Sequence, residues 1–152
     1  MKLTAFSDYS LRVLMYLAVQ PGRRATIAEI AAAFDISEHH LVKVVHFLAK
    51  SGRLTSTRGK GGGLELGAPP EALGVGEIVR DTEGRSVIVE CFDPAHPNCS
   101  IAGACRLRGV FGEALRAFFA VLDRYTVADL VANDRQLARI LFLQPPLPRR
   151  RA

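Results

Sequence analysis

Two features that direct a chain to a membrane or out of the cell are missing from this sequence. A membrane-spanning helix requires a run of about 18 apolar residues. No run in this sequence approaches that length, although 49% of the residues are hydrophobic. Residues 1–8 carry a lysine before any apolar stretch and contain no small-residue cleavage site. We therefore expect a cytosolic protein with one core, and a length that fits one domain with an appended element.

Cysteine is scarce, and its few copies are clustered. Cys91, Cys99 and Cys105 are the only three, and they fall within fifteen positions. An odd number of thiols in a reducing compartment does not fit a disulfide framework, and the Cys-x7-Cys-x5-Cys spacing lacks the close pairs typical of structural zinc. Two prolines and a glycine between the cysteines indicate a loop. Three thiols on a loop fit an iron–sulfur cluster better than zinc; unrelated free thiols are the alternative.

Three thiolates leave one position of such a cluster for another ligand. His96, Asp93 and Glu90 are local candidates, and Asp8 is a distant one. Taken by itself, Asp8 is explained as a carboxylate in the first turn of a helix, where the helix dipole favours a negative charge. The residues alone leave the fourth ligand open.

Charge is unevenly distributed along the chain, whose formal net charge is +5. Residues 1–66 carry nine Lys/Arg and five Asp/Glu, residues 67–148 carry eight and ten, and three arginines follow. A basic first half joined to a slightly acidic second half favours a nucleic-acid-binding module attached to another element.

The first half has the pattern of a helix-turn-helix. We predict a helix over residues 8–20 with Ser7 as its N-cap, a second helix begun by a Thr26/Glu29 capping box, and a third from Ser37 to about Lys50. In this geometry the third helix enters the DNA major groove. Its N-terminal residues would meet base edges and its lysines would reach phosphates, although a solvated helix face or, for the histidines, a metal site would look similar. The candidate DNA-contacting residues on this helix are Ser37, His39, His40, Lys43 and Lys50.

A basic hairpin follows the third helix. Residues 53–57 alternate as a strand, residues 58–63 form a glycine-rich turn, and residues 64–66 return. Arg58 at the tip suits a narrow, electronegative minor groove, and Lys60 adds a second cation there. Because no helix begins at this turn, a phosphate-cradling nucleotide loop is disfavoured. The pattern predicts a winged helix-turn-helix.

The second half contains one long amphipathic segment. After a linker at residues 68–70 we predict a short helix over about 75–82, an extended stretch over 86–90, and then the cysteine loop. Apolar residues then recur at alternating steps of four and three, which is a heptad pattern and favours a dimerisation helix. These residues are Leu107, Phe111, Ala114, Phe118, Val121 and Tyr125. Thr126 and then Asn133 or Asp134 are expected to cap two terminal helices, the last ending near Leu143, before a disordered tail.

Several motifs resemble one known family. They are Phe6-Ser7-Asp8-Tyr9, residues 56–63 of the turn, residues 75–79, Cys91-Phe92-Asp93-Pro94, Cys105-Arg106-Leu107-Arg108 and residues 122–130. Together they resemble the nitric-oxide-sensitive repressors of the winged-helix iron–sulfur regulator family, to which the IscR-type regulators also belong. The likeness runs from the start of the chain to about residue 143.

The resemblance implies a homodimer with one 4Fe–4S cluster per subunit. Its ligands would be Cys91, Cys99 and Cys105 from one subunit and Asp8 from the other. The gap between Cys91 and Cys99 is long for the family, which keeps His96 as a possible substitute. An IscR-type protein would carry a histidine three residues after the last cysteine, where this sequence has Arg108.

The sequence therefore predicts a mainly α protein: a winged helix-turn-helix domain with a small β-hairpin wing, plus a long C-terminal dimerisation helix. The expected division is 1–68 for DNA binding, 69–105 for a connecting helix and cluster loop, 106–143 for dimerisation, and 144–152 for a basic tail. The predicted function is a nitric-oxide-responsive repressor that binds a palindromic operator as a cluster-loaded homodimer. The alternatives are a related iron–sulfur or redox-sensing regulator, a zinc-stabilised regulator and a cluster electron carrier. No nucleophile–base pair is recognisable, so we do not expect an enzyme.

Overall fold

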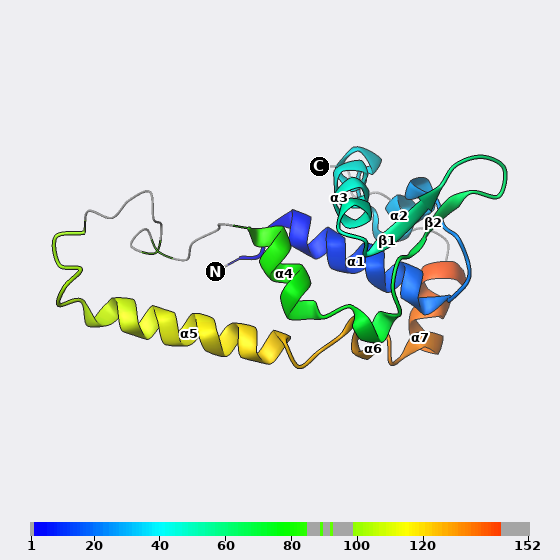
Figure 1. Ribbon diagram of the computed structural model, residues 1–152. Coiled ribbons are helices and arrows are strands. Elements are labelled where there is room, and N and C mark those ends of the chain that lie inside the picture. The colour runs from blue at the N-terminus through cyan, green and yellow to red at the C-terminus, as the bar shows by residue number, and fades with distance from the viewer. Residues whose placement is uncertain (1, 85–88, 90–91, 93–98, 144–152) are drawn as a thin grey trace.

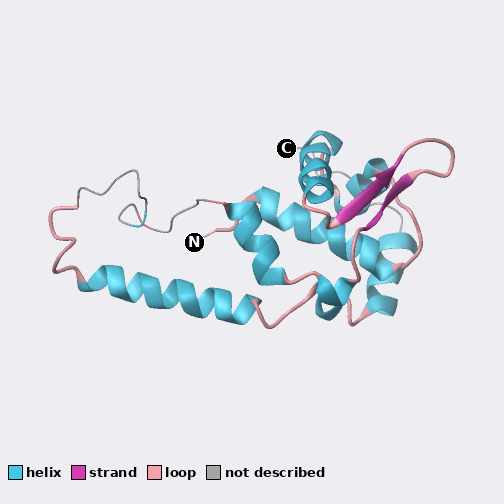
Figure 2. Cartoon of the chain, viewed as in Figure 1, coloured by secondary structure: helices cyan, strands magenta, loops and turns pink. Residues whose placement is uncertain are grey.

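The computed structural model describes residues 2–84, 89, 92 and 99–143. Helices dominate these residues, and the two strands form a single hairpin (Figures 1 and 2). The elements are α1 (Ala5–Val19), α2 (Ile27–Phe34), α3 (Glu38–Lys50), β1 (Leu54–Thr57), β2 (Gly63–Leu66), a 3-10 turn (Pro70–Ala72), α4 (Val75–Glu83), α5 (Arg106–Leu122), α6 (Val127–Leu130), α7 (Asp134–Ala138) and a π-helical turn (Arg139–Leu143). The mainly α fold with a small wing is as predicted.

Helix α1 begins earlier than the sequence predicted. Thr4, not Ser7, is the N-cap, and its side-chain oxygen accepts a hydrogen bond from the Ser7 backbone N–H at 3.2 Å. Both residues are good N-caps, but Ser7 is completely buried and its hydroxyl is bonded to α4. The prediction that Ser7 caps the helix was therefore wrong, because a long-range contact uses its side chain.

Helices α2 and α3 follow the predicted pattern. Thr26 and Glu29 form the expected capping box, and Asp35 ends α2 in a left-handed conformation at φ 51°. The largest fully buried side chains come from α1, α2, α3, β1 and α4, so one core joins the helix-turn-helix to the wing and to α4. These side chains include Leu14, Ile30, Leu41, Leu48, Leu54 and Ile78.

The wing is a two-stranded antiparallel hairpin whose register pairs Leu54 with Leu66 and Thr57 with Gly63. Ala25 extends it by one bridge, exchanging hydrogen bonds with Leu64 at 2.7 and 3.1 Å. Figure 1 shows the turn between β1 and β2 projecting beyond the helices that carry it.

Helix α5 extends away from the winged domain along one side of the molecule (Figure 1). None of its 17 residues is buried, and Leu107, Val110 and Val121 expose about half or more of their surface. The helix ends at Leu122, so the prediction that Tyr125 continues its apolar face as a helical residue was wrong. The Tyr125 carbonyl instead accepts a hydrogen bond from the Val75 N–H at 2.9 Å, which ties the chain back to the start of α4.

Helix α4 meets the end of α5 at a very close contact. A Cβ added to Gly76 would collide with the Asp123 side chain and lie 3.1 Å from the Asp123 backbone nitrogen. Arg80 of α4 donates two hydrogen bonds to the Asp123 carboxylate at 2.7 and 2.6 Å, and its guanidinium lies 4.3 Å from the centre of the Phe119 ring. The Arg80 hydrogen bond lowers the pKa of Asp123 below its usual value.

The terminal elements pack back on the winged domain. Thr126 caps α6 through a second capping box, and Asn133 is the N-cap of α7, as predicted. The α-helix ends at Ala138, and the chain continues to Leu143 as a π-helical turn. The predicted extended stretch 86–90 and the tail lie almost entirely outside the described residues. Among the described residues, no helix is both long and apolar enough to cross a membrane.

Candidate nucleic-acid interface and metal centre

The residues predicted to contact DNA gather on α3 and on the turn of the wing. Ser37 is the N-cap of α3 and its side chain makes no capping hydrogen bond. The side chains of His39, His40, Lys43 and Lys50 are all exposed on this helix. The cations of α3 thus face solvent on the side opposite to the buried stripe of the helix.

The wing presents its cations on a turn shaped by glycine. Arg58 and Lys60 are exposed, and Gly59 between them has φ 97°, a left-handed conformation that favours glycine. A Cβ at Gly62 would collide with the backbone of Thr57, so the turn closes tightly at its base. Both cations therefore lie exposed on the turn, as the sequence predicted.

One side of the wing is held by ion pairs that sequence reasoning missed. Arg24 contacts the Glu65 carboxylate at 3.2 Å, and its hydrogen bond lowers the pKa of Glu65. The Arg53 guanidinium, whose side chain is 8% exposed, donates to Glu77 at 3.1 Å and to Asp81 of α4. The Arg53 pairs tie the base of the wing to α4, and the Arg24 pair ties strand β2 to the segment between α1 and α2. The partners lie 24 to 41 residues apart, too far for a local signal.

Asp8, a predicted cluster ligand, lies on the first turns of α1 with 47% of its side chain exposed. Both of its oxygens contact the Arg12 guanidinium, at 3.0 and 2.9 Å. This i,i+4 pair was visible in the sequence and was missed. The next residue, Tyr9, stacks on His40 of α3 with ring centres 6.4 Å apart.

A hydrogen-bond network anchors the start of α1 to the end of α4. Glu83 Oε1 accepts hydrogen bonds from the Thr4 N–H at 2.8 Å, from the Thr4 hydroxyl at 3.0 Å and from the Ser7 hydroxyl. Burial by itself raises the pKa of Glu83, but these hydrogen bonds together outweigh it and the pKa is lowered. Asp8 is therefore held on a helix end that α4 fixes.

Two of the three predicted thiols are described. Cys105 is half-buried and is the N-cap of α5, whereas Cys99 is exposed. Two turns separate them, in which the Ala102 N–H donates to the Cys99 carbonyl and the Ala104 N–H to the Ile101 carbonyl, each at 3.0 Å. Cys91, His96, Asp93 and Glu90 lie outside the described residues. Within the described ranges, no three His, Cys, Asp or Glu side chains lie close enough together to hold a metal ion.

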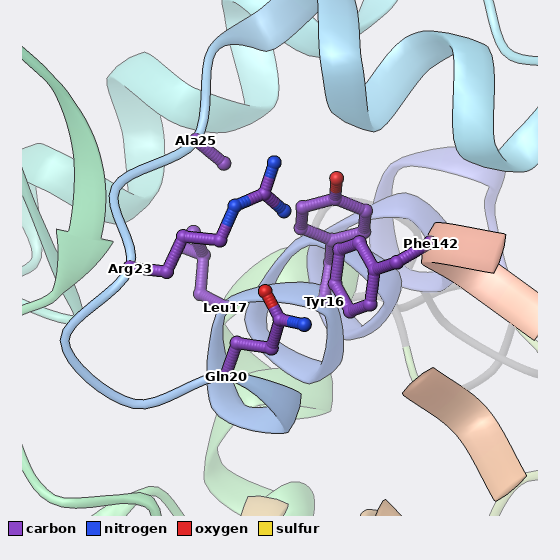
Figure 3. A pocket seen from close by; sticks show the side chains of 6 residues that line it. All are labelled: Tyr16, Leu17, Gln20, Arg23, Ala25 and Phe142. Atoms are coloured by element: carbon purple, nitrogen blue, oxygen red, sulfur yellow. The ribbon is translucent and has the colours of Figure 1, made fainter. Parts of the chain in front are cut away.

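The described part of the chain also contains a small hollow between α1, the segment that follows it and the π-helical turn (Figure 3). It encloses no space that could hold a ligand, whereas ligand pockets have volumes of about 300 Å³ or more. The Arg23 guanidinium lies 4.9 Å from the centre of the Phe142 ring and fills part of the hollow. This hollow is too small for a substrate site.

Comparisons with known proteins assign the chain. Residues 3–133 match the model of the Rrf2 family, described as an iron-dependent transcriptional regulator. The chain is 47% identical over 145 residues to the HTH-type transcriptional regulator NsrR of Bacillus subtilis (strain 168), covering 95% of this chain and 99% of that protein. It is 44% identical over 142 residues to NsrR of Shouchella clausii (strain KSM-K16), covering 93% and 95%.

Solved structures agree with this assignment. IscR of T. potens superposes with a TM-score of 0.69 at 25% identity, covering 88% of each chain. The oxidized form of Staphylococcus aureus CymR superposes with a TM-score of 0.67 at 28% identity, covering 86% of this chain and 95% of that one. With a winged helix-turn-helix, exposed cations on α3 and on the wing, and a family match over most of its length, the chain belongs to the Rrf2 family of transcriptional regulators rather than to a family of enzymes.

Proposed function

We propose that this chain is a nitric-oxide-responsive transcriptional repressor that binds a palindromic operator as a homodimer. The observation that carries the proposal is the connection between two parts: a winged helix-turn-helix with exposed cations, and a cysteine loop that leads directly into a helix with an unburied apolar face. The 47% identity to a regulator named NsrR supports the same function. We also propose the division into residues 1–68, 69–105, 106–143 and 144–152.

The donor atoms of the loop suit a 4Fe–4S cluster, one per subunit. Thiolates are the usual ligands of iron–sulfur clusters, and Cys99 and Cys105 are both accessible to some extent. We propose Cys91 as the third thiolate and Asp8 of the partner subunit as the fourth ligand, with His96 as the alternative. When bound there, the cluster would supply the chemistry that responds to nitric oxide, and loss of the Asp8 contact would weaken operator binding.

We infer dimerisation through α5 from the apolar side chains that this helix exposes. Leu107, Val110 and Val121 are exposed to 59%, 60% and 46%, and burying such side chains contributes about 25 cal/mol per Å². A second copy would cover this face. A two-fold dimer presents two α3 helices to two half-sites, which accounts for a palindromic operator.

The proposed DNA contacts divide into two kinds. Ser37, His39 and His40 lie at the start of α3, where residues of a recognition helix meet base edges. Lys43 and Lys50 further along the helix would contact phosphates, and Arg58 and Lys60 of the wing would enter or border the minor groove. Phosphate contacts supply affinity, and base contacts supply sequence preference.

The chain has a short physical route from Asp8 to the DNA-binding helix. Phe6 and Tyr9 flank Asp8 on α1, and they contact Phe47 and His40 of α3 with ring centres 5.3 and 6.4 Å apart. Holding Asp8 in the partner subunit would fix α1, and through these rings it would fix α3. When Asp8 is released, Arg12 is the residue placed to pair with it.

The test is an anaerobic purification followed by measurement of iron, acid-labile sulfide and the visible spectrum. DNA binding is then measured while nitric oxide is titrated, using a site selected from a random pool. We expect a coloured protein with about four irons per subunit and loss of DNA binding as nitric oxide is added. A colourless protein that contains zinc would exclude the cluster. Binding that survives nitric oxide, although the spectrum bleaches, would exclude the sensing function.

Two variants separate the ligand roles. Cys105→Ala is expected to abolish stable iron binding, whereas Asp8→Ala is expected to retain iron and to lose much of the response of DNA binding to nitric oxide. Asp134→Ala, at an exposed carboxylate in the first turn of α7, is the matched control and should change neither. Complete loss of iron in Asp8→Ala would contradict the proposed division of roles.

The second candidate is a regulator that responds to cluster supply or redox state. Arg108 is exposed on α5, at the position where the resemblance predicts a histidine in IscR-type proteins. Arginine does not ligate iron as histidine does, because its guanidinium stays protonated. The same titration distinguishes the candidates, since a supply sensor would lose DNA binding on iron depletion and keep it on brief exposure to nitric oxide.

A further inference from the structure

The solvent-facing side of α3 contains one apolar side chain among polar ones. Val42 is 52% exposed. The other exposed side chains of this helix are Glu38, His39, His40, Lys43, His46 and Lys50. An isolated exposed valine on an ordinary surface requires no explanation. On the helix that the proposed function places in the major groove, it is the only exposed residue that cannot donate or accept a hydrogen bond.

The two sides of this exposed face are not equivalent. On one side, His40 and Phe47 contact rings of α1, Tyr9 at 6.4 Å and Phe6 at 5.3 Å between ring centres. Val42 lies on the other side, and residues four apart such as Val42 and His46 lie one above the other on a helix. Val42 therefore shares its direction with His46, on the side of α3 that α1 leaves open.

We propose that Val42 contacts the C5-methyl group of a thymine in each half-site of the operator. This inference rests on the proposed function as a DNA-binding dimer and specifies which base one residue recognises. In the major groove the four bases present hydrogen-bonding groups, and the thymine methyl is the one apolar group among them. Lys43 is next to Val42 in sequence and exposed, so a phosphate contact there would hold the helix close enough for the valine to touch a base.

The size of the effect follows from the area involved. A contact between one methyl group of Val42 and the thymine methyl should raise affinity about fourfold per half-site. In a dimer with two half-sites the product is about tenfold to twentyfold. Val42→Ala should lower affinity for the selected operator by this factor and leave the thermal midpoint nearly unchanged, because the side chain is half exposed in the free protein.

The experiment replaces thymine by deoxyuridine, which keeps every hydrogen-bonding group of the base and lacks only the methyl. The purified, cluster-loaded wild-type protein selects its site from random DNA, and each thymine of that site is then replaced in turn. We expect one thymine in each half-site whose replacement weakens wild-type binding about fourfold. The same replacement should change binding of Val42→Ala by less than a factor of about 1.5, since the variant lacks the contact.

Lys43→Ala is the matched variant on the neighbouring position. It should bind all sequences more weakly, lower the salt dependence, and still respond to deoxyuridine like the wild type. The inference is overturned if no thymine replacement affects the wild type, or if Val42→Ala loses as much as the wild type at the same thymine. A wild-type protein that selects no sequence at all would overturn both the proposed function and this inference. A negative deoxyuridine result alone would overturn only the inference.

Discussion

Helices α1 and α5 are of similar length, 15 and 17 residues, but they are buried very differently. Eight residues of α1 are buried, among them Val13, Leu14 and Leu17, whereas α5 has no buried residue. Both helices carry apolar residues at helical spacing. The difference is that α1 is surrounded by α3, α4, α6 and the wing, while the largest set of contacts made by α5 is with α4.

Helix α1 is packed within the chain, whereas the apolar face of α5 stays exposed. An isolated helix of about 15 residues is marginally stable in water, so most of the stability of α5 must come from packing. Its contacts with α4 centre on Arg80, Phe119 and Asp123, at its C-terminal end. The N-terminal part of α5, which follows Cys105, is the part that a second subunit would cover in the proposed dimer.

The largest expected effect is in the α1 core. Leu14→Ala removes a side chain that is 0% exposed and should lower the free energy of unfolding by about 2–5 kcal/mol. Val42→Ala, at a side chain that is 52% exposed, is the control and should change it by less than about 0.5 kcal/mol. Urea unfolding followed by circular dichroism measures both. Equal losses would mean that burial in the structure does not govern stability here.

The second expected effect distinguishes α5 from α1 directly. Leu107→Asp places a charge on the exposed apolar face and should weaken dimerisation at least about tenfold, because the carboxylate would be desolvated at the interface. Sedimentation equilibrium measures the dimer constant. Glu113→Gln, a polar exposed position on the same helix, should leave it unchanged. A normal dimer in Leu107→Asp would exclude this face as the interface.

A third effect tests the link between the wing and α4. Arg53→Met keeps the buried stem and removes the guanidinium that contacts Glu77 and Asp81. The two carboxylates are 70% and 47% exposed and can rehydrate, so the loss should be about 1–2 kcal/mol, less than for a fully buried pair. The affinity for DNA should also fall, because the wing would be held less firmly against α4. Glu77→Gln should have a smaller effect, since Asp81 still holds the guanidinium.

The smallest expected effect depends on pH. The pKa of Glu83 is lowered from its ordinary value of 4.5, so its carboxylate stabilises the fold above about pH 4.5, and this contribution is lost as the pH falls through the folded pKa. Glu83→Gln should therefore lower stability by less than about 1 kcal/mol at pH 7, and the difference should shrink toward pH 4. Glu71→Gln, at an exposed position, is the control. A difference that is constant with pH would contradict this assignment.

Local signals predicted the winged domain well. The Thr26/Glu29 capping box, the start of α3 at Ser37 and the glycine turn of the wing are each determined by residues a few positions apart, and the structure contains all three. The errors came from contacts across the chain. Ser7 lost its expected capping role to a bond with Glu83, and Tyr125 left the helix because its carbonyl bonds Val75.

The candidate site divides in the same way. The cations of α3 and the wing could be predicted because a helix has one exposed face and a hairpin has one tip. The Cys-x7-Cys-x5-Cys spacing predicted a thiol site, and it gave no information on what holds Asp8. The ion pair between Asp8 and Arg12 could have been predicted from their i,i+4 spacing. The network around Glu83 had no local signal, because Glu83 is separated from Ser7 by 76 positions and from Thr4 by 79.

The contact between Gly76 and Asp123 would have a geometric consequence for the proposed dimer. With hydrogen as its only side chain, Gly76 lets the backbone of α4 touch the end of α5, and Arg80 locks the two together. Seventeen residues make α5 a rod about 26 Å long. A rotation of about 5° at this joint moves the far end of such a rod by about 2 Å. In the proposed dimer, this joint would therefore act as a pivot, and its angle would set the distance between the two α3 helices.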